Sequence, residues 1–82
     1  MKVAVDVSLY PFQEDLIPPI RDVIARLNSY DSLYVSTNSM STQIRGEYDD
    51  VMAAITTEFQ ATFEQLPKAV FVMKILNNPI AD

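Results

Sequence analysis

The sequence predicts an α+β fold in which two helices pack on one face of a four-stranded antiparallel sheet. Three observations predict it: segments with an apolar period of two, segments with a helical apolar period, and the order of these segments. The order is strand, helix, strand, strand, helix, strand. With right-handed crossovers this order gives a ferredoxin-like βαββαβ sandwich with the spatial strand order four, one, three, two. We expect a single domain over residues 1–82.

The first strand is expected over residues 2–10 and ends at Pro11. Its odd positions are apolar and face the helices, namely Val3, Val5, Val7 and Leu9. The first helix is expected over residues 17–29, because a Pro pair is tolerated in its first turn and an apolar stripe follows. Asp22 and Arg26 are four residues apart in this helix, and we expect both on its outer face.

In the second half of the chain, the residue pattern predicts a hairpin, a helix and a last strand. The hairpin joins strands at residues 33–38 and 42–46 through a short turn. The second helix covers residues 47–66, and its acidic first residues are typical of a helix start rather than of a metal site. The last strand, residues 69–77, is apolar on both faces except at Lys74, and a short tail follows. We expect Met52 and Met73 to fill gaps in the core.

Composition excludes several function classes. The chain has 82 residues, 49% of them hydrophobic, with 6 basic and 11 acidic side chains and a net charge of -5. This balance argues against nucleic acid or an anionic membrane as partner. Because Cys and His are absent, zinc sites with N or S ligands and imidazole-based catalysis are excluded, and we expect no cofactor and no metal. No apolar run is long enough for a spanning helix or a signal peptide, so the cytoplasm is the expected location.

The second face of the sheet is the candidate for function, because two helices can cover only one face. Alternation puts polar side chains on this open face: Asp6, Ser8 and Tyr10 from the first strand and Ser36, Asn38, Gln43 and Arg45 from the hairpin. A register that pairs Ala4 with Leu76 places Asp6 opposite Lys74. The carboxylate at the centre of the first strand thereby gains a cation.

Three uses of the open face remain: contact with solvent, contact with another subunit, or a ligand site. The last strand favours a subunit contact, since Val70, Val72 and Leu76 would otherwise be exposed side by side. Any ligand pocket would then lie at the polar end of the face. The candidate ligand-binding residues are Asp6, Ser8, Tyr10, Asn38, Gln43 and Lys74.

Three segments, "DVSLYP" (6–11), "TNSMSTQIRGEYDDVMAAI" (37–55) and "VFVMKILN" (70–77), resemble the thiamine-binding-like (Ykof-type) domain family. This family is associated with thiamine and its hydroxymethylpyrimidine precursor. The resemblance implies a ferredoxin-like fold, a homodimer or homotetramer, and binding of thiamine or its pyrimidine half without catalysis.

An aminopyrimidine presents an amino donor beside ring-nitrogen acceptors. Asp6 would accept from the amino group, while Ser8, Asn38 or Gln43 would supply the complementary contacts. Tyr10 or Tyr34 would stack on the ring. The alternative is an interaction or regulatory module whose open face mediates oligomerisation without a small ligand. A catalytic alternative, with Asp6 as a base beside Lys74, is disfavoured by the missing His, Cys and metal constellations.

Overall fold

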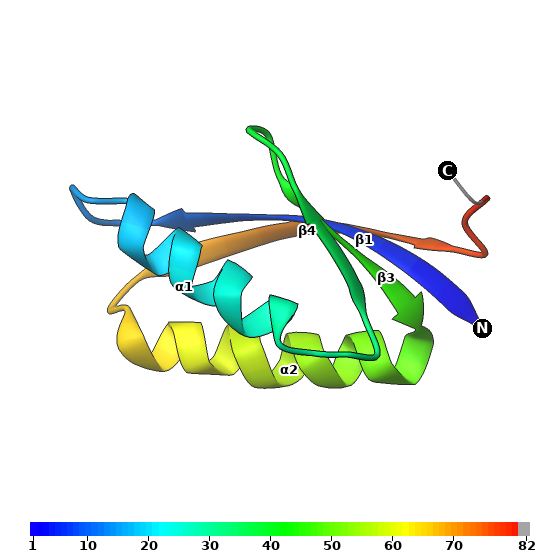
Figure 1. Cartoon of the computed structure of the whole chain (residues 1–82). Coiled ribbons are helices and arrows are strands. Elements are labelled where there is room, and N and C mark those ends of the chain that lie inside the picture. Colours follow the sequence, from blue (N-terminus) through cyan, green and yellow to red (C-terminus); the bar gives the residue numbers. More distant parts are fainter. Residues whose placement is uncertain (81–82) are drawn as a thin grey trace.

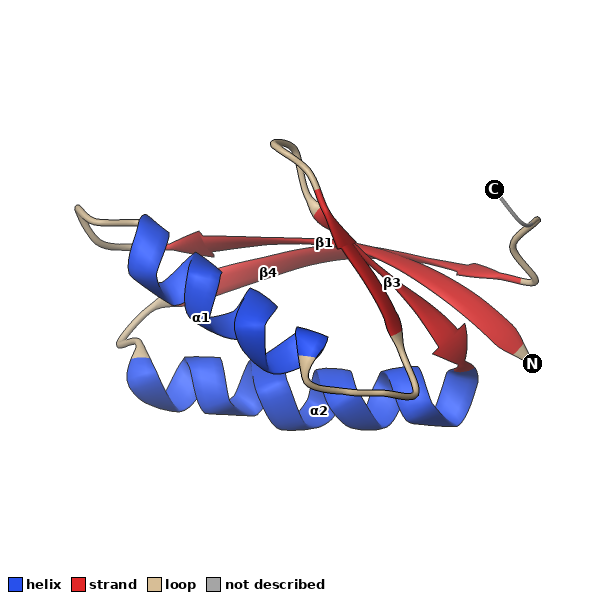
Figure 2. Ribbon diagram, in the orientation of Figure 1, coloured by secondary structure: helices blue, strands red, loops and turns tan. Residues whose placement is uncertain are grey.

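The computed structural model describes residues 1–80 and has the predicted order of elements. These are β1 (Lys2–Pro11), α1 (Ile17–Asn28), β2 (Tyr34–Thr37), β3 (Thr42–Glu47), α2 (Tyr48–Gln65) and β4 (Ala69–Asn77). The strand order in the sheet is β2-β3-β1-β4, as predicted. Both helices lie on one face of the sheet and leave the other face uncovered (Figures 1 and 2). The fold is therefore ferredoxin-like; the last two residues of the predicted tail, 81–82, lie outside the described residues.

The register of β1 is fixed on both sides by antiparallel pairing. On one side Ala4 pairs with Leu76 and Asp6 with Lys74, which confirms the predicted register. This pairing with β4 runs on to Pro11. On the other side, the pairing with β3 ends where Val7 meets Thr42. The last part of β1, residues 8–11, therefore has a strand neighbour on one side only.

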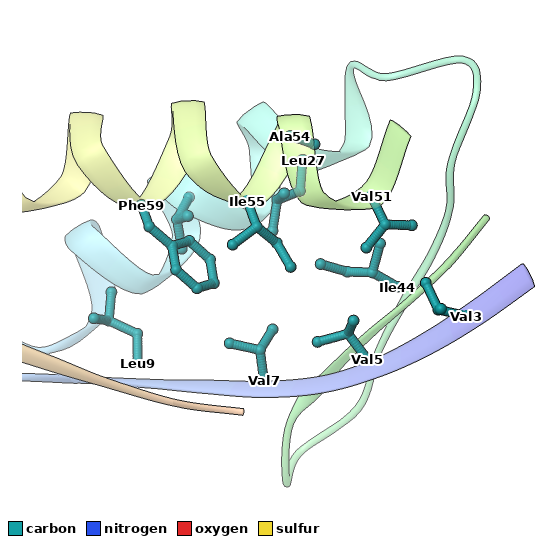
Figure 3. Packing of buried hydrophobic residues seen from close by; sticks show 11 residues of the cluster. Val3, Val5, Val7, Leu9, Leu27, Ile44, Val51, Ala54, Ile55 and Phe59 are labelled. Atoms are coloured by element: carbon teal, nitrogen blue, oxygen red, sulfur yellow. The ribbon is translucent and has the colours of Figure 1, made fainter. Parts of the chain in front are cut away.

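The core lies between the sheet and the helices (Figure 3). It combines the odd positions of β1 with one β3 residue and side chains from both helices: Ile44, Val23, Leu27, Val51, Ala54, Ile55 and Phe59. Phe59 of α2 also stacks on Phe71 of β4, with 3.7 Å between the ring centroids and 2° between the planes. Alternation along β1 thus places every other side chain in the core, as the apolar period of two predicts.

Met73 does not fill a gap in the core, contrary to expectation. It points toward the helix side but is 39% exposed, and its neighbour on that side, Ile75, is 45% exposed. The reason is that β4 is an edge strand, while the helices lie mainly over the other strands. Met52 does pack against the core. From Val72 to Leu76, β4 consequently exposes apolar side chains on both faces of the sheet.

The acidic segment after β3 does begin a helix. Glu47 precedes α2, and Asp49 and Asp50 lie in its first turn, where the helix dipole favours negative charge. The terminal amino group donates to Glu47 Oε2 at 3.1 Å, and Lys2 Nζ lies 3.3 Å from Oε1. Hydrogen bonds from these two cations lower the pKa of Glu47. The start of β1 is thereby tied to the start of α2.

A polar network links the two helices. Arg26 of α1 donates through Nε to Glu58 Oε1 at 2.7 Å and through Nη2 to Thr62 Oγ1 at 2.7 Å. Tyr30 donates to the second Glu58 oxygen at 2.5 Å, and Arg26 also bonds Asp22. Glu58 and Thr62 are buried. The expectation that Arg26 lies on the outer face was wrong, because its long side chain reaches across to the buried carboxylate of α2.

Replacing Arg26 with Ala is expected to lower the free energy of unfolding by about 2 to 3 kcal/mol, because the buried Glu58 carboxylate loses its cation. This is below the loss for a fully enclosed pair, since the Arg26 side chain is 23% exposed. Urea unfolding measures the change. Arg21→Ala, on the exposed surface of the same helix, is the control and should change stability by less than about 0.5 kcal/mol. Equal losses in the two variants would contradict a role for the network.

Stability should also fall at alkaline pH. The hydrogen bond to Glu58, with burial and the negative charge of Glu58, raises the pKa of Tyr30 above 10.0. The folded state therefore holds this proton more tightly than the unfolded state. The resulting stability is complete below the unfolded pKa and is lost as pH rises through the folded pKa. As pH rises above about 10, urea unfolding should show a smaller loss in Tyr30→Phe than in the wild type, while exposed Tyr34→Phe should follow the wild type.

Candidate ligand site

A cavity of about 330 Å³ lies beside the end of β1, between α1 and the turn that joins β2 to β3. This volume is at the lower end of the range for small-molecule sites. Consecutive residues of β1, from Val7 to Pro11, line it together with the turn residues 37–42. The walls from the helix layer are apolar: Leu16, Ile20, Val23, Ile24, Leu27 and Phe59.

The cavity exists because the β2–β3 hairpin turns back before it reaches the end of β1. Asn38 Oδ1 accepts hydrogen bonds from the backbone N–H of Met40 at 2.8 Å and of Ser41 at 3.0 Å. The N–H of Asn38 donates to the carbonyl of Ser41 at 3.0 Å. These bonds close the turn on itself, and its tip rises away from the helix layer (Figure 1). The edge of β1 beyond Val7 is left without a strand beside it.

The chemistry of the lining is uncharged. No Asp, Glu, Lys or Arg is among the lining residues, and the polar residues among them are Ser8, Tyr10 and those of the turn. The rim carries exposed apolar side chains, with Met40 at the tip of the turn 85% exposed. Stacked Phe59 and Phe71 form part of the inner wall. Such a cavity suits a small flat ligand that is held by apolar contact and oriented by a few hydrogen bonds.

The six predicted ligand-binding residues fall into two groups. Ser8, Tyr10 and Asn38 line the cavity. The other three, Asp6, Gln43 and Lys74, lie side by side on the open face, because Asp6 pairs with both of the others in the register. The structure therefore brings each group together, but it does not join the two groups in one pocket.

The open-face group is centred on Asp6. Lys74 Nζ lies 3.7 Å from Asp6 Oδ2, and the Lys74 side chain is 83% exposed. The second oxygen, Asp6 Oδ1, is buried and has no hydrogen-bond partner among residues 1–80. A buried carboxylate oxygen without a donor is unusual in a native structure. A donor from outside the chain could satisfy this buried oxygen.

Sequence reasoning missed the α1 wall and the turn residues Ser39, Met40 and Ser41. A signal for the cavity was present in the strand lengths. β1 has 10 residues, whereas β3 has 6, so β3 is too short to accompany β1 to its end. The position of the unpaired part follows only once the register is known.

The described residues hold neither a metal-ligand cluster nor a membrane-spanning helix. Within residues 1–80, no three Cys, His, Asp or Glu side chains come together in a way that could hold a metal ion. Neither α1 nor α2 is both long and apolar enough to cross a membrane.

Several solved structures share this fold. A hypothetical protein of Methanocaldococcus jannascii is 24% identical, with a TM-score of 0.80 over 99% of this chain and 84% of that one. A protein of Streptococcus pneumoniae is 21% identical, with a TM-score of 0.88 over 98% and 90%. A Thermotoga maritima protein, described as a candidate for thiamine biosynthesis or salvage, is 21% identical, with a TM-score of 0.82 over 92% and 82%.

No curated protein matches the sequence significantly. The family comparison is decisive, because the profile described as thiamine-binding protein matches residues 5–79, which run from the middle of β1 past the end of β4. The matched range includes both the cavity and the open-face group. The chain belongs to the thiamine-binding protein family.

Proposed function

We propose that this chain binds thiamine or its hydroxymethylpyrimidine moiety in the cavity beside β1, without catalysing a reaction. The observation that carries the proposal is an uncharged cavity of about 330 Å³, with apolar walls and a polar edge, in a chain of the thiamine-binding protein family. The relative from Thermotoga maritima, described as a candidate for thiamine biosynthesis or salvage, supports the same ligand class. The cytoplasmic location expected from the sequence is part of this proposal.

The pyrimidine ring would lie between the side chains of α1 and the edge of β1. Ile20 and Ile24 of α1 offer apolar contact to one face of the ring. Ser8 can donate or accept a hydrogen bond at the ring edge. Asn38 uses Oδ1 in the turn, which leaves its Nδ2 group as the donor toward a ring nitrogen. Tyr10, at the outer end of β1, would cover the ring or its substituent.

Asp6, Gln43 and Lys74 provide a second position for the same ligand. The observation that favours it is Asp6 Oδ1, which lacks a donor among the described residues and could accept from the amino group of an aminopyrimidine. Gln43 and Lys74 flank it on the neighbouring strands. The two positions differ in chemistry, because only the open-face position supplies charged groups.

Calorimetric titration with hydroxymethylpyrimidine and thiamine tests the proposal. The wild type should bind at least one of the two compounds. Ile24→Trp should weaken binding by about tenfold or more, because the larger side chain fills the cavity. Ala25→Trp adds the same side chain on the exposed surface of α1 and is the matched control.

Asp6→Asn distinguishes the two positions. If the cavity holds the ligand, this variant should bind within about twofold of the wild type, since it keeps the shape of the side chain. Loss of binding in Asp6→Asn, with normal binding in Ile24→Trp, would move the site to the open face. Absence of heat with either compound at millimolar concentration would remove the proposed function.

An oligomeric role is the second candidate, and a specific surface favours it. The apolar patch consists of Tyr10, Val70, Val72 and Leu76 on the open face. Tyr10, Val72 and Leu76 are 56%, 52% and 57% exposed. The patch continues along β4, an edge strand whose outer backbone groups can pair with another strand. We therefore extend the proposal to a homodimer or homotetramer in which a second copy covers the apolar patch.

Light scattering coupled to size exclusion tests the assembly. The wild type should have a mass of two or four times the 9.3 kDa of one chain. Val72→Asp should shift it toward the mass of one chain, because a buried unpaired carboxylate opposes association. Ser36→Asp places the same charge on β2, outside the apolar patch, and should leave the mass unchanged. A wild-type chain of monomeric mass would contradict the oligomeric role and leave the ligand proposal untouched.

A further inference from the structure

We infer that the backbone N–H and C=O of Leu9 are the hydrogen-bonding pair that recognises the ligand in the cavity. A flat heterocycle with a donor next to an acceptor would then occupy the place that a strand beside β1 would take. This inference rests on the proposed function and deepens it, because it assigns recognition to the main chain rather than to a charged side chain.

The hydrogen bonds of β1 define which neighbour each residue faces. In an antiparallel sheet a residue directs its N–H and C=O to the same side, and successive residues alternate. The N–H of Asn78 donates to the carbonyl of Lys2 at 2.9 Å, and the N–H of Phe12 donates to the carbonyl of Lys68 at 3.1 Å. Even-numbered residues of β1 therefore face β4. The N–H of Tyr48 donates to the carbonyl of Met1 at 2.9 Å, so odd-numbered residues face β3.

Leu9 is the first odd-numbered residue beyond the reach of β3. The pairs on this side are Val3 with Gly46, Val5 with Ile44 and Val7 with Thr42. Continued by two residues, this register would oppose Leu9 to Met40. Met40 instead lies in the turn, and its N–H donates to Asn38 Oδ1. The N–H and C=O of Leu9 consequently have no partner within the described residues.

The lining of the cavity agrees with this geometry. Five consecutive residues, Val7 to Pro11, line it. Their side chains alternate between the two faces of the sheet, so what they have in common is the edge of the strand. The side chain of Leu9 itself is buried in the core. Leu9 lines the cavity, and its unpaired N–H and C=O lie on this edge of β1, so a ligand that bonds both groups removes the cost of leaving them unpaired.

The spacing of the two groups defines the ligand class. Leu9 presents its N–H donor and its C=O acceptor on the same side of the strand. A ligand that bonds both groups therefore needs an acceptor next to a donor. A ring nitrogen beside an exocyclic amino group, as in a 4-aminopyrimidine, provides this pair: the ring nitrogen accepts from Leu9 N–H, and the amino group donates to Leu9 C=O. An extended peptide fits poorly, because the next odd-numbered residue, Pro11, has no N–H and the turn at 38–41 blocks a longer strand.

Amide hydrogen exchange followed by NMR tests the free edge before any ligand is added. The Leu9 amide should exchange about tenfold or more faster than the amides of Ser8 and Tyr10, which face β4 in the same strand. These two neighbours are the internal control. Equal protection of all three amides would overturn the inference, whatever the protein binds.

The second arm adds hydroxymethylpyrimidine at saturating concentration. The Leu9 amide should become protected and its proton resonance should move downfield, while Ser8 and Tyr10 keep their protection. An analogue with a methyl group in place of the amino group, and one with carbon in place of the adjacent ring nitrogen, should each bind about tenfold or more weakly.

The outcomes separate the two claims. Binding without a change at Leu9, or analogues that bind as tightly as hydroxymethylpyrimidine itself, would overturn the inference and leave the proposed function standing. Binding that protects Leu9 in the wild type but not in Ile24→Trp would support both. Absence of binding by every pyrimidine would remove the proposed function and this inference together.

Discussion

The unequal pairing of β1 controls the architecture around the candidate site. β1 is held by β4 as far as Pro11, but β3 accompanies it only to Val7. A strand needs one neighbour to stay in place, so the end of β1 remains ordered while its other edge is uncovered. The cavity beside β1 and the unpaired backbone groups of Leu9 both follow from this single mismatch.

The helix pair fixes the opposite wall of the cavity. α1 contributes most of that wall, and the bonds from Arg26 to Glu58 and Thr62 hold α1 against α2. A buried ion pair of this kind contributes little net stability compared with apolar packing, but moving α1 away from α2 would leave Glu58 buried without its cation. The wall is therefore set at the middle and end of α1, whereas Leu16, just before its start, is an exposed lining residue.

The sequence was sufficient for the fold and for the register of β1 with β4. The apolar period of two decided which side chains of β1 face the helices, whereas β4 is apolar on both faces, so its register followed from the pairing of Asp6 with Lys74. The contact of the Arg26 side chain with buried Glu58, and the existence of the cavity, could not be predicted from apolar periodicity. Both depend on distances between elements far apart in the chain: the reach of Arg26 to Glu58, and the place where the hairpin turns back. Ser8, Tyr10 and Asn38 were selected for their facing, but they line the cavity because they flank the uncovered edge.

The two proposed surfaces share one residue. Tyr10 belongs to the apolar patch on the open face and also lines the cavity. A second copy that covers the patch would restrict the Tyr10 side chain, and so would a ligand beside β1. The first of the two, ligand or second copy, would already restrict the Tyr10 side chain, so the other would lose less conformational entropy when it binds. Ligand binding and assembly would then favour each other, provided that both need the same Tyr10 rotamer. If ligand binding and assembly require different Tyr10 rotamers, each would weaken the other. The Tyr10 rotamer would therefore determine whether the coupling between ligand binding and assembly is positive or negative.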